Sequence, residues 1–227
     1  MKTAPISEVF FSLQGEGPYV GTGHVFVRFA GCNMKCDYCD TPTKKYKEYD
    51  INTLVREVKD LIKKHKVQYL SLSGGEPLLQ TEFIIEFLEK AHFKKVFIYL
   101  ETNGILYYNF RKVKKLIDIV SLDIKLPSAT KTKAYWGEHR EFLKLCKGKK
   151  AFAKAVITGS CVIDDLKKAV KLIRETDSSI SLIIQPDSTN KITQTLVNKA
   201  MRFQKYARGY LSDVRVIPQM HKFLKIR

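Results

Sequence analysis

The chain has 227 residues, enough for one well-buried domain and too few for two comfortable ones. Hydrophobic residues make up 44% and charged residues 28%, as in ordinary globular proteins, and 40 basic against 23 acidic residues give a net charge of +17. No apolar run reaches the roughly 20 residues that cross a bilayer, and the first residues lack a signal-peptide stretch. We therefore expect a cytoplasmic protein with no membrane partner.

The excess of positive charge has two interpretations. A basic surface favours anionic partners such as RNA, phosphorylated metabolites or carboxylate substrates. The lysines are scattered at helical spacing, as in residues 59–66 and 167–174, rather than gathered in one segment. This pattern favours solvated helix faces, and we expect no nucleic-acid partner.

Short apolar runs alternate along the chain with longer amphipathic ones. The expected strands cover residues 24–30, 68–73, 95–101, 119–125, 151–158, 180–186 and 213–218. Between them, apolar residues at i, i+3, i+4 and i+7 predict helices at 51–65, 81–92, 110–117, 133–146, 164–176 and 193–207. Such alternation indicates an α/β protein built from βαβ units around a parallel sheet. Six or so units fit an open barrel or a doubly wound sheet, and periodicity is compatible with both.

Unusual polar residues follow the predicted strands, at the sheet edge where α/β active sites gather. They are Cys32 after the first strand, and residues 73–77, 101–104, 123–127 and 185–187 after later ones. No linker, repeat or low-complexity segment divides the chain. We expect one domain, residues 1–227, with one site at this edge.

Three cysteines lie close together in the loop 31–41. Cys32, Cys36 and Cys39 have the spacing Cys-x3-Cys-x2-Cys, and soft anionic thiolates bind iron–sulfur clusters well. Three thiolates leave one iron of a 4Fe-4S cubane open for a ligand. Cys146 and Cys161 stand alone, and we interpret both as small buried hydrophobic residues.

A zinc site is the alternative interpretation of the cysteine loop. Zinc knuckles favour a second Cys-x2-Cys pair, which the sequence lacks, although Cys146 or His221 could supply a fourth ligand.

The cysteine spacing resembles the signature of the radical S-adenosylmethionine superfamily, and residues 74–77 resemble its GGEP motif. The resemblance implies a single-domain partial (β/α)6 TIM-like barrel. It also implies that the open iron of the cluster binds S-adenosylmethionine, whose reductive cleavage yields a radical that abstracts hydrogen. It also implies cofactor contacts from residues of several loops. These are Tyr38 beside the adenine, Gly74, Gly75 and Glu76 at the methionine amino group, Asn103 and Lys125. Glu76 carries a charge that can attract an ammonium group.

The segment 12–41 resembles, more narrowly, the 7-carboxy-7-deazaguanine synthase family. Further resemblances lie at 73–80, 101–104, 123–128 and 218–222, so that the match runs through the chain in order, with a generic middle. The family converts 6-carboxy-5,6,7,8-tetrahydropterin to 7-carboxy-7-deazaguanine with loss of ammonia, on the route to queuosine and archaeosine. S-adenosylmethionine is regenerated there as a cofactor.

The same resemblance implies the substrate contacts and partners. The loop 12–17, with Leu13, Gln14, Gly15 and Glu16, is expected to bind the substrate together with Arg28 and Thr102. Arg28 has the planar donors that suit a carboxylate, and Glu16 can accept hydrogen bonds from a pterin. Thr41 is expected to bind Mg2+. The expected assembly is a homodimer, with flavodoxin or ferredoxin as electron donor.

Other interpretations remain at this stage. Arg28 lies within a strand and could be an ordinary ion-pair partner, and Thr41 could merely start a turn. A glycyl-radical enzyme activase shares the cysteine triplet and GGEP but needs a protein docking face. A non-catalytic metal-containing module that binds RNA would use the positive charge, but has no use for an open iron.

Overall fold

The computed structural model describes residues 2–40, 45–189 and 191–226. Within them, nine strands form one sheet in the order β3-β1-β2-β4-β5-β6-β7-β8-β9. The strands are β1 (Thr3–Leu13), β2 (Gly23–Phe29), β3 (Lys47–Asp50), β4 (Tyr69–Gly74), β5 (Phe97–Thr102), β6 (Ile119–Asp123), β7 (Lys150–Ile157), β8 (Ser181–Pro186) and β9 (Val214–Val216). Strands β2 and β4 to β9 are parallel, whereas β1 is antiparallel to β2 and β3.

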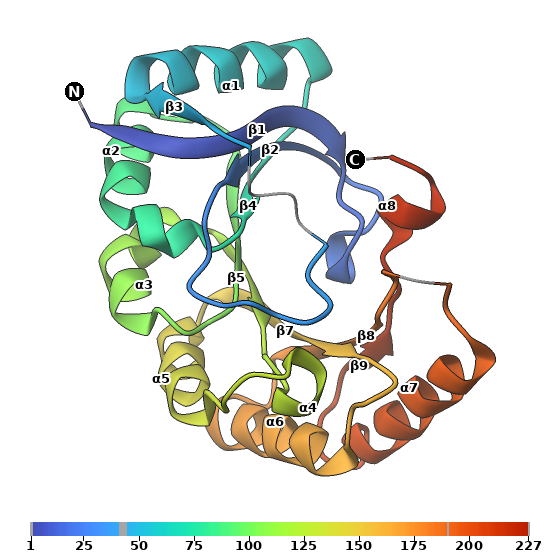
Figure 1. Ribbon diagram of the computed structural model, residues 1–227. Coiled ribbons are helices and arrows are strands. Elements are labelled where there is room, and N and C mark those ends of the chain that lie inside the picture. Colours follow the sequence, from blue (N-terminus) through green and yellow to red (C-terminus); the bar gives the residue numbers. More distant parts are fainter. Residues whose placement is uncertain (1, 41–44, 190, 227) are drawn as a thin grey trace.

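The helices are α1 (Ile51–His65), α2 (Thr81–Ala91), α3 (Tyr107–Val113), α4 (Pro127–Thr130), α5 (Trp136–Cys146), α6 (Ile163–Thr176), α7 (Gln194–Ala207) and α8 (Met220–Phe223), with short 3-10 turns η1 (Gly17–Tyr19), η2 (Pro77–Gln80) and η3 (Lys114–Leu116). The long helices α1, α2, α3, α5, α6 and α7 lie outside the curved sheet (Figure 1). Six successive crossovers, each containing one of α1, α2, α3, α5, α6 and α7, connect the parallel strands. The expected partial (β/α)6 barrel is confirmed, and the doubly wound sheet is excluded because the strand order follows the chain.

Helix α1 shows how local sequence signals set an element's ends. Asp50 precedes the helix, and its side chain accepts hydrogen bonds from the backbone N–H groups of Asn52 and Thr53 at 2.9 and 3.1 Å. Lys66 ends it in the left-handed conformation, with φ of 53°. The helix therefore occupies the residues 51–65 that its apolar periodicity predicts.

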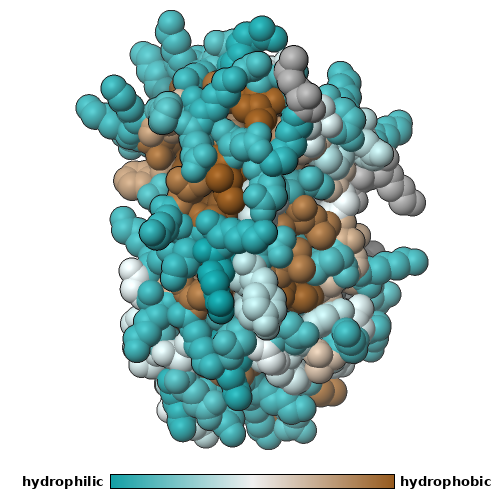
Figure 2. All heavy atoms as spheres, turned by 90° about the vertical axis from the view of Figure 1, so that its left-hand side faces the viewer, coloured by the Kyte–Doolittle hydropathy of each residue, from teal (hydrophilic) through white to brown (hydrophobic). Residues whose placement is uncertain are grey.

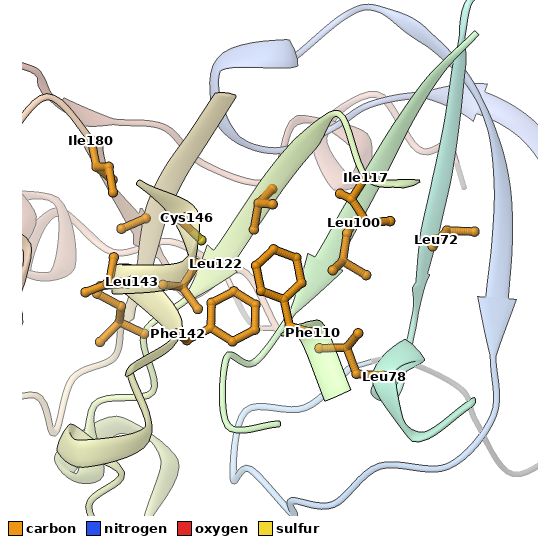
Figure 3. Close-up of a cluster of buried hydrophobic side chains, with 14 of the residues drawn as sticks. Leu72, Leu78, Leu100, Phe110, Ile117, Leu122, Phe142, Leu143, Cys146 and Ile180 are labelled. Atoms are coloured by element: carbon orange, nitrogen blue, oxygen red, sulfur yellow. The ribbon is translucent and has the colours of Figure 1, made fainter. Parts of the chain in front are cut away.

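The outward face of the sheet packs against the helices to form the main core. Leu100 and Leu122 point from β5 and β6 toward Phe110 of α3 and Phe142 of α5 (Figure 3). The two phenylalanine rings stack with centroids 4.4 Å apart, and both side chains are fully buried. Burial of a side chain this large contributes about 1.5–3 kcal/mol, so this layer supplies most of the stabilisation.

The inward face of the sheet divides into two levels because side chains alternate along a strand. The lower level, which we call the barrel floor, is an apolar cluster made of Tyr19, Tyr69, Tyr99, Ile119, Phe152, Ile183 and Ile217. Nearer the carboxyl ends of the strands, polar side chains replace it. We call this level the barrel rim; it consists of Arg28, Glu101, Asp123, Lys154 and Gln185.

Strand β1 was not predicted from the sequence. Its run contains Pro5, which argues against a central strand, and its pairing with β2 is irregular between Ile6 and Glu8. Strand β1 extends through Leu13, so the segment expected as the loop 12–17 begins inside a strand. The short strand β3 was also not predicted.

The surface that covers α1 to α3 is mostly hydrophilic, with hydrophobic patches between the charged side chains (Figure 2). In the described parts of the chain, no helix combines the length and apolar character that a membrane span requires.

Candidate functional site

Two adjoining cavities open at the carboxyl ends of the parallel strands. The larger has a volume of about 730 Å³ and is lined by the three clustered cysteines and by the ends of β4 to β8. The smaller, of about 310 Å³, is lined by residues 13–16 and by Arg28 of β2. Both cavities share the lining residues Glu16, Asp40, Gly74, Glu101 and Gln219. Apart from Glu76, which lines neither cavity, and Thr41, which lies outside the described residues, the sequence-predicted site residues therefore line two compartments at one edge of the sheet.

Cys32, Cys36 and Cys39 all line the larger cavity and are free thiols. Burial raises the pKa of Cys36 to about 11 and also raises the pKa of Cys32. Thiolates at these positions therefore need a positive partner, which cluster iron would supply. Cys146 and Cys161 are buried, as expected for small hydrophobic residues.

The zinc alternative requires thiolates that converge on a single ion at about 2.3 Å. In the part of the chain that the structure describes, no three His, Cys, Asp or Glu side chains are grouped closely enough to hold one metal ion. A cubane is wider than one ion and takes each thiolate at a different corner. Three cysteines that line one cavity are compatible with such a cluster.

The cysteine loop rests directly on the two glycines at the end of β4. Gly74 has φ of +123°, and a Cβ atom there would lie 2.1 Å from the carbonyl oxygen of Phe29. A Cβ atom on Gly75 would lie 1.8 Å from the carbonyl oxygen of Gly31. The N–H of Gly75 donates to Phe29 at 3.0 Å, so the two loops fit together only without side chains here.

Glu76, whose carboxylate is expected to attract a ligand's ammonium group, has a fully buried side chain. It accepts hydrogen bonds from Leu78 N, Thr102 Oγ1 and Asn103 N at 3.1, 2.9 and 2.8 Å. Burial raises the pKa of Glu76 to about 7, although these donors oppose the shift. Its role is to join the loops after β4 and β5, while Gly74 and Gly75 line the cavity.

Asn103 connects the loop after β5 to the cysteine loop. Its Nδ2 donates to Asn33 Oδ1 at 2.7 Å and lies 3.9 Å from Cys32 Sγ. Thr102, whose hydroxyl is engaged with Glu76, lines the larger cavity beside it. The structure thus places both residues next to the cysteines rather than in the smaller cavity.

Tyr38 and Lys125 also line the larger cavity. Lys125 Nζ donates to the Tyr38 hydroxyl at 3.3 Å and pairs with Asp123 Oδ2 at 2.8 Å. Burial alone would lower the pKa of Lys125, but the charge of Asp123 and the neighbouring Tyr38 raise it well above its usual value. Lys125 is therefore a fixed cation beside the aromatic ring.

Glu16 is held from three directions. Its Oε2 pairs with Lys154, its Oε1 accepts from Gln219 Nε2 at 2.7 Å, and its N–H donates to Gln14 Oε1 at 3.0 Å. Burial would raise the pKa of Glu16, but the charge and hydrogen bond of Lys154 outweigh it and the pKa is lowered. Gln14 in turn donates to Glu101 at 2.9 Å. The carboxylate of Glu16 is thus ionised and preoriented.

Arg28 faces the smaller cavity and also has an ion-pair partner. Its Nη1 lies 2.9 Å from Glu8 Oε2, and its guanidinium lies 4.8 Å above the Phe10 ring. The side chain is 20% exposed. Both interpretations of Arg28 from the sequence are therefore compatible with its position.

The segment 219–222 covers the loop 12–17. Met220 N donates to the Gly15 carbonyl at 2.9 Å, and a Cβ atom on Gly15 would lie 2.2 Å from His221 Nδ1. Lys222 pairs with Asp40 of the cysteine loop. Leu13 and Gly15 line the smaller cavity beneath this cover. Thr41, the expected Mg2+ ligand, lies outside the described residues.

Sequence reasoning did not single out Lys154 or Gln219 as site residues. Lys154 is the one charged residue in the otherwise apolar run 151–158, and a charge at an inward position of a central strand is the signal that could have found it. Gln219 lies within the recognised segment 218–222, but nothing in its type distinguishes it.

Comparison with known proteins places these features in a family. Residues 26–184 match the model of the Radical SAM superfamily. The chain is 32% identical to the 7-carboxy-7-deazaguanine synthase of Geobacter sulfurreducens, with 97% of each chain covered, and 34% identical to that of Archaeoglobus fulgidus, with 99% of each covered. The crystal structure of QueE from Escherichia coli superposes with a TM-score of 0.63 at 16% identity, covering 96% of this chain and 94% of that one.

The chain therefore belongs to the Radical SAM superfamily and, within it, to the 7-carboxy-7-deazaguanine synthase family of enzymes. A structure of TYW1 with a lysine-pyruvate adduct bound has the same fold over 83% of this chain, with a TM-score of 0.59.

Proposed function

We propose that this enzyme converts 6-carboxy-5,6,7,8-tetrahydropterin to 7-carboxy-7-deazaguanine with loss of ammonia, in 7-deazapurine biosynthesis. The observation that carries the proposal is the pair of adjoining cavities, one lined by three cysteines and the other by Glu16 and Arg28. A cofactor in the first would lie next to a small charged substrate in the second. The family membership supports the identity of both molecules.

The larger cavity would hold a 4Fe-4S cluster and S-adenosylmethionine. Cys32, Cys36 and Cys39 would bind the cluster, and the cavity residues around them would contact S-adenosylmethionine. These contacts are Tyr38, Gly74, Gly75, Asn103 and Lys125. When bound, the pair supplies a radical that abstracts hydrogen from the substrate. Glu76 would act through the loops it joins rather than by contact.

The smaller cavity would hold the pterin. Arg28 would bind the substrate carboxylate through its planar donors, since its guanidinium faces this cavity. Glu16 would accept N–H groups of the pterin, with Gln14, Leu13 and Gly15 beside it. Thr102, which lines the other cavity, would contact the substrate where the two cavities meet.

Loss of ammonia requires a proton on the departing nitrogen. Glu101 borders both cavities and is partly buried. Burial and the charge of Glu16 raise its pKa, although Lys154 and Gln14 oppose the shift. A carboxyl group of this kind is suited to hold a proton near the reacting ring.

The two rival functions fit the geometry less well. A glycyl-radical enzyme activase must admit a segment of another protein, whereas a cavity of about 310 Å³ beside the larger one suits a small molecule. A non-catalytic RNA-binding module gives no reason for an ionised, partly buried Glu16 in the cavity that the cysteines line.

The test is turnover by the anaerobically reconstituted protein. Dithionite, Mg2+, S-adenosylmethionine and the carboxytetrahydropterin are added, and mass analysis is expected to show 7-carboxy-7-deazaguanine. An intact cluster that cleaves S-adenosylmethionine without forming this product would remove the substrate assignment and keep the superfamily chemistry.

Four expectations from the sequence analysis stay predictions. They are Mg2+ bound by Thr41, a homodimeric assembly, reduction by flavodoxin or ferredoxin, and a cytoplasmic location. Omission of Mg2+ from the turnover assay and measurement of mass in solution test the first two directly.

A further inference from the structure

Lys154 lies between two carboxylates at the barrel rim. Its Nζ pairs with Glu16 Oε2 and lies 3.5 Å from Asp123 Oδ2. The side chain is only 12% exposed, so water cannot solvate the ammonium well. A buried charge of this kind depends on its carboxylate partners for compensation.

Asp123 has one carboxylate oxygen that accepts no hydrogen bond from the described residues. Its Oδ2 already accepts from Lys125 at 2.8 Å, whereas its Oδ1 is buried and has no hydrogen-bond partner among the described residues. A buried carboxylate oxygen without a donor is unfavourable. A donor that moves toward Asp123 would therefore be stabilised.

Glu16, in contrast, has no carboxylate oxygen free of a protein donor. Both of its oxygens accept from protein donors, Oε2 from Lys154 and Oε1 from Gln219. A pterin that brings two adjacent N–H donors to this carboxylate must displace at least part of that arrangement. Each donor lies 3.5 Å from a second carboxylate, Lys154 from Asp123 Oδ2 and Gln219 from Asp40 Oδ2. Asp40 Oδ2 is already paired with Lys222, whereas Asp123 keeps a buried oxygen without a donor, so Lys154 is the donor with an acceptor to move to.

We infer that Lys154 is a positioning residue with two partners. It neutralises Glu16 while the smaller cavity is empty, and it transfers to Asp123 Oδ1 when a ligand's N–H donors take Glu16. The ammonium stays paired in both arrangements, so ligand binding leaves no buried charge uncompensated. The inference rests on the proposed function, because it takes Glu16 as the site for the pterin N–H groups.

The transfer has two consequences. A ligand without two adjacent N–H donors cannot replace the ammonium at Glu16, so Lys154 selects pterins over other small carboxylates. Asp123 also holds Lys125, which donates to the Tyr38 hydroxyl at 3.3 Å in the cysteine loop. Occupation of the smaller cavity therefore changes the donors around a carboxylate of the larger one.

A double-mutant cycle on ligand affinity tests the transfer. The probe is 6-carboxypterin, a fluorescent oxidised analogue that keeps the carboxylate and the N–H donors, titrated into the unreduced anaerobic holoenzyme. We expect Asp123→Asn to weaken binding at least about 10-fold when Lys154 is present and at most about 2-fold in the Lys154→Met background. Lys150→Met, an exposed lysine on the same strand, should leave the 10-fold effect unchanged.

The cycle reports only a change in the Lys154–Asp123 interaction on binding. An interaction of equal strength in the free and the bound protein does not affect the dissociation constant. Zero coupling between Lys154 and Asp123, or coupling of the opposite sign, overturns the inference and leaves the proposed function intact. Failure of the unmodified enzyme to bind 6-carboxypterin counts against the proposed substrate itself. If Lys154→Met does not fold, as judged by cluster absorbance and circular dichroism, Lys154→Gln carries the same cycle.

Discussion

On β5, β7 and β8 the barrel floor and the barrel rim occupy neighbouring inward-facing positions, yet they are built on opposite principles. On β5 the floor residue is Tyr99 and the rim residue is Glu101; on β7 they are Phe152 and Lys154. Burial of apolar area accounts for the floor, where every ring adds stability. The rim concentrates buried charges, which cost desolvation and stabilise little even when paired. The floor therefore maintains the fold, and the rim is explained by the chemistry at the site.

The largest effect is expected from removing one of the three cysteines that would bind the cluster, which should abolish activity while the fold is retained. Cys36→Ala is expected to abolish cluster binding and turnover, because two thiolates cannot hold the cubane. Iron and sulfide analysis measures the loss. Cys146→Ala, a buried cysteine in α5, is the matched control and should keep a full complement of cluster. Full iron and sulfide in the Cys36 variant would contradict the ligand assignment.

A substitution in the barrel floor should lower the stability of the fold rather than remove a ligand from the site. Ile183→Ala removes a fully buried side chain and is expected to lower the free energy of unfolding by about 2–5 kcal/mol, through lost burial and a cavity. Urea unfolding measures the change. Val162→Ala, at a residue that is 50% exposed, should change it by less than about 0.5 kcal/mol. A small effect at Ile183 together with a large drop in ligand affinity would break the division between floor and rim.

Glu16→Gln tests whether rim charge serves binding. The Gln amide has the same shape as the Glu carboxylate, but it replaces one of the two acceptor oxygens with an NH2 donor. The affinity for 6-carboxypterin should therefore fall about 10- to 100-fold. Fluorescence titration measures it, with Glu48→Gln on the exposed part of β3 as control. Unchanged affinity would show that the pterin N–H groups bind elsewhere.

His24 gives the floor a pH dependence. The ring is buried, stacks on Tyr69 at 4.7 Å and bonds to Ser71 Oγ at 2.7 Å. Burial lowers its pKa from 6.5 to about 4. As pH falls below 6.5 the unfolded chain gains a proton that the folded chain excludes, so stability declines until the folded pKa is reached.

This linkage predicts a loss of about 2 kcal/mol between pH 7 and pH 5 from His24. Urea unfolding at both pH values should show that His24→Gln removes this part of the loss. A residual slope is expected from His139, whose pKa burial also lowers to about 4. If the free energy of unfolding depended on pH equally in the unmodified protein and in the His24→Gln variant, the His24 ring would not be the group that folding keeps unprotonated.

Most of the parallel part of the fold could be predicted from the sequence, since apolar periodicity is a local property. The predicted strand at 119–125 and helix at 164–176 match β6 and α6 within two residues at each end. Strand β1 could not be predicted in the same way, because Pro5 and an irregular pairing obscure its alternation. Its pairing is fixed by β2 and β3, not by its own pattern.

The cysteine side of the site was also predictable, because its ligands lie within eight residues of each other. The other side was not. The Lys154–Glu16 contact joins residues 138 positions apart, and neither residue alone reveals the pairing. The burial of Glu76 could not be predicted for a related reason: two of its three donors lie at the end of the next strand, at Thr102 and Asn103.

The hydrogen bond between Gln219 and Glu16 spans 203 positions of the chain. During synthesis, the cysteine loop and the glycines of β4 can come together early, whereas the compartment above Arg28 stays open until residues 219–222 have emerged from the ribosome. A nascent chain could thus acquire its iron before it has anywhere to bind a pterin. This order of assembly would keep the reactive centre without a substrate until residues 219–222 have folded over the loop 12–17.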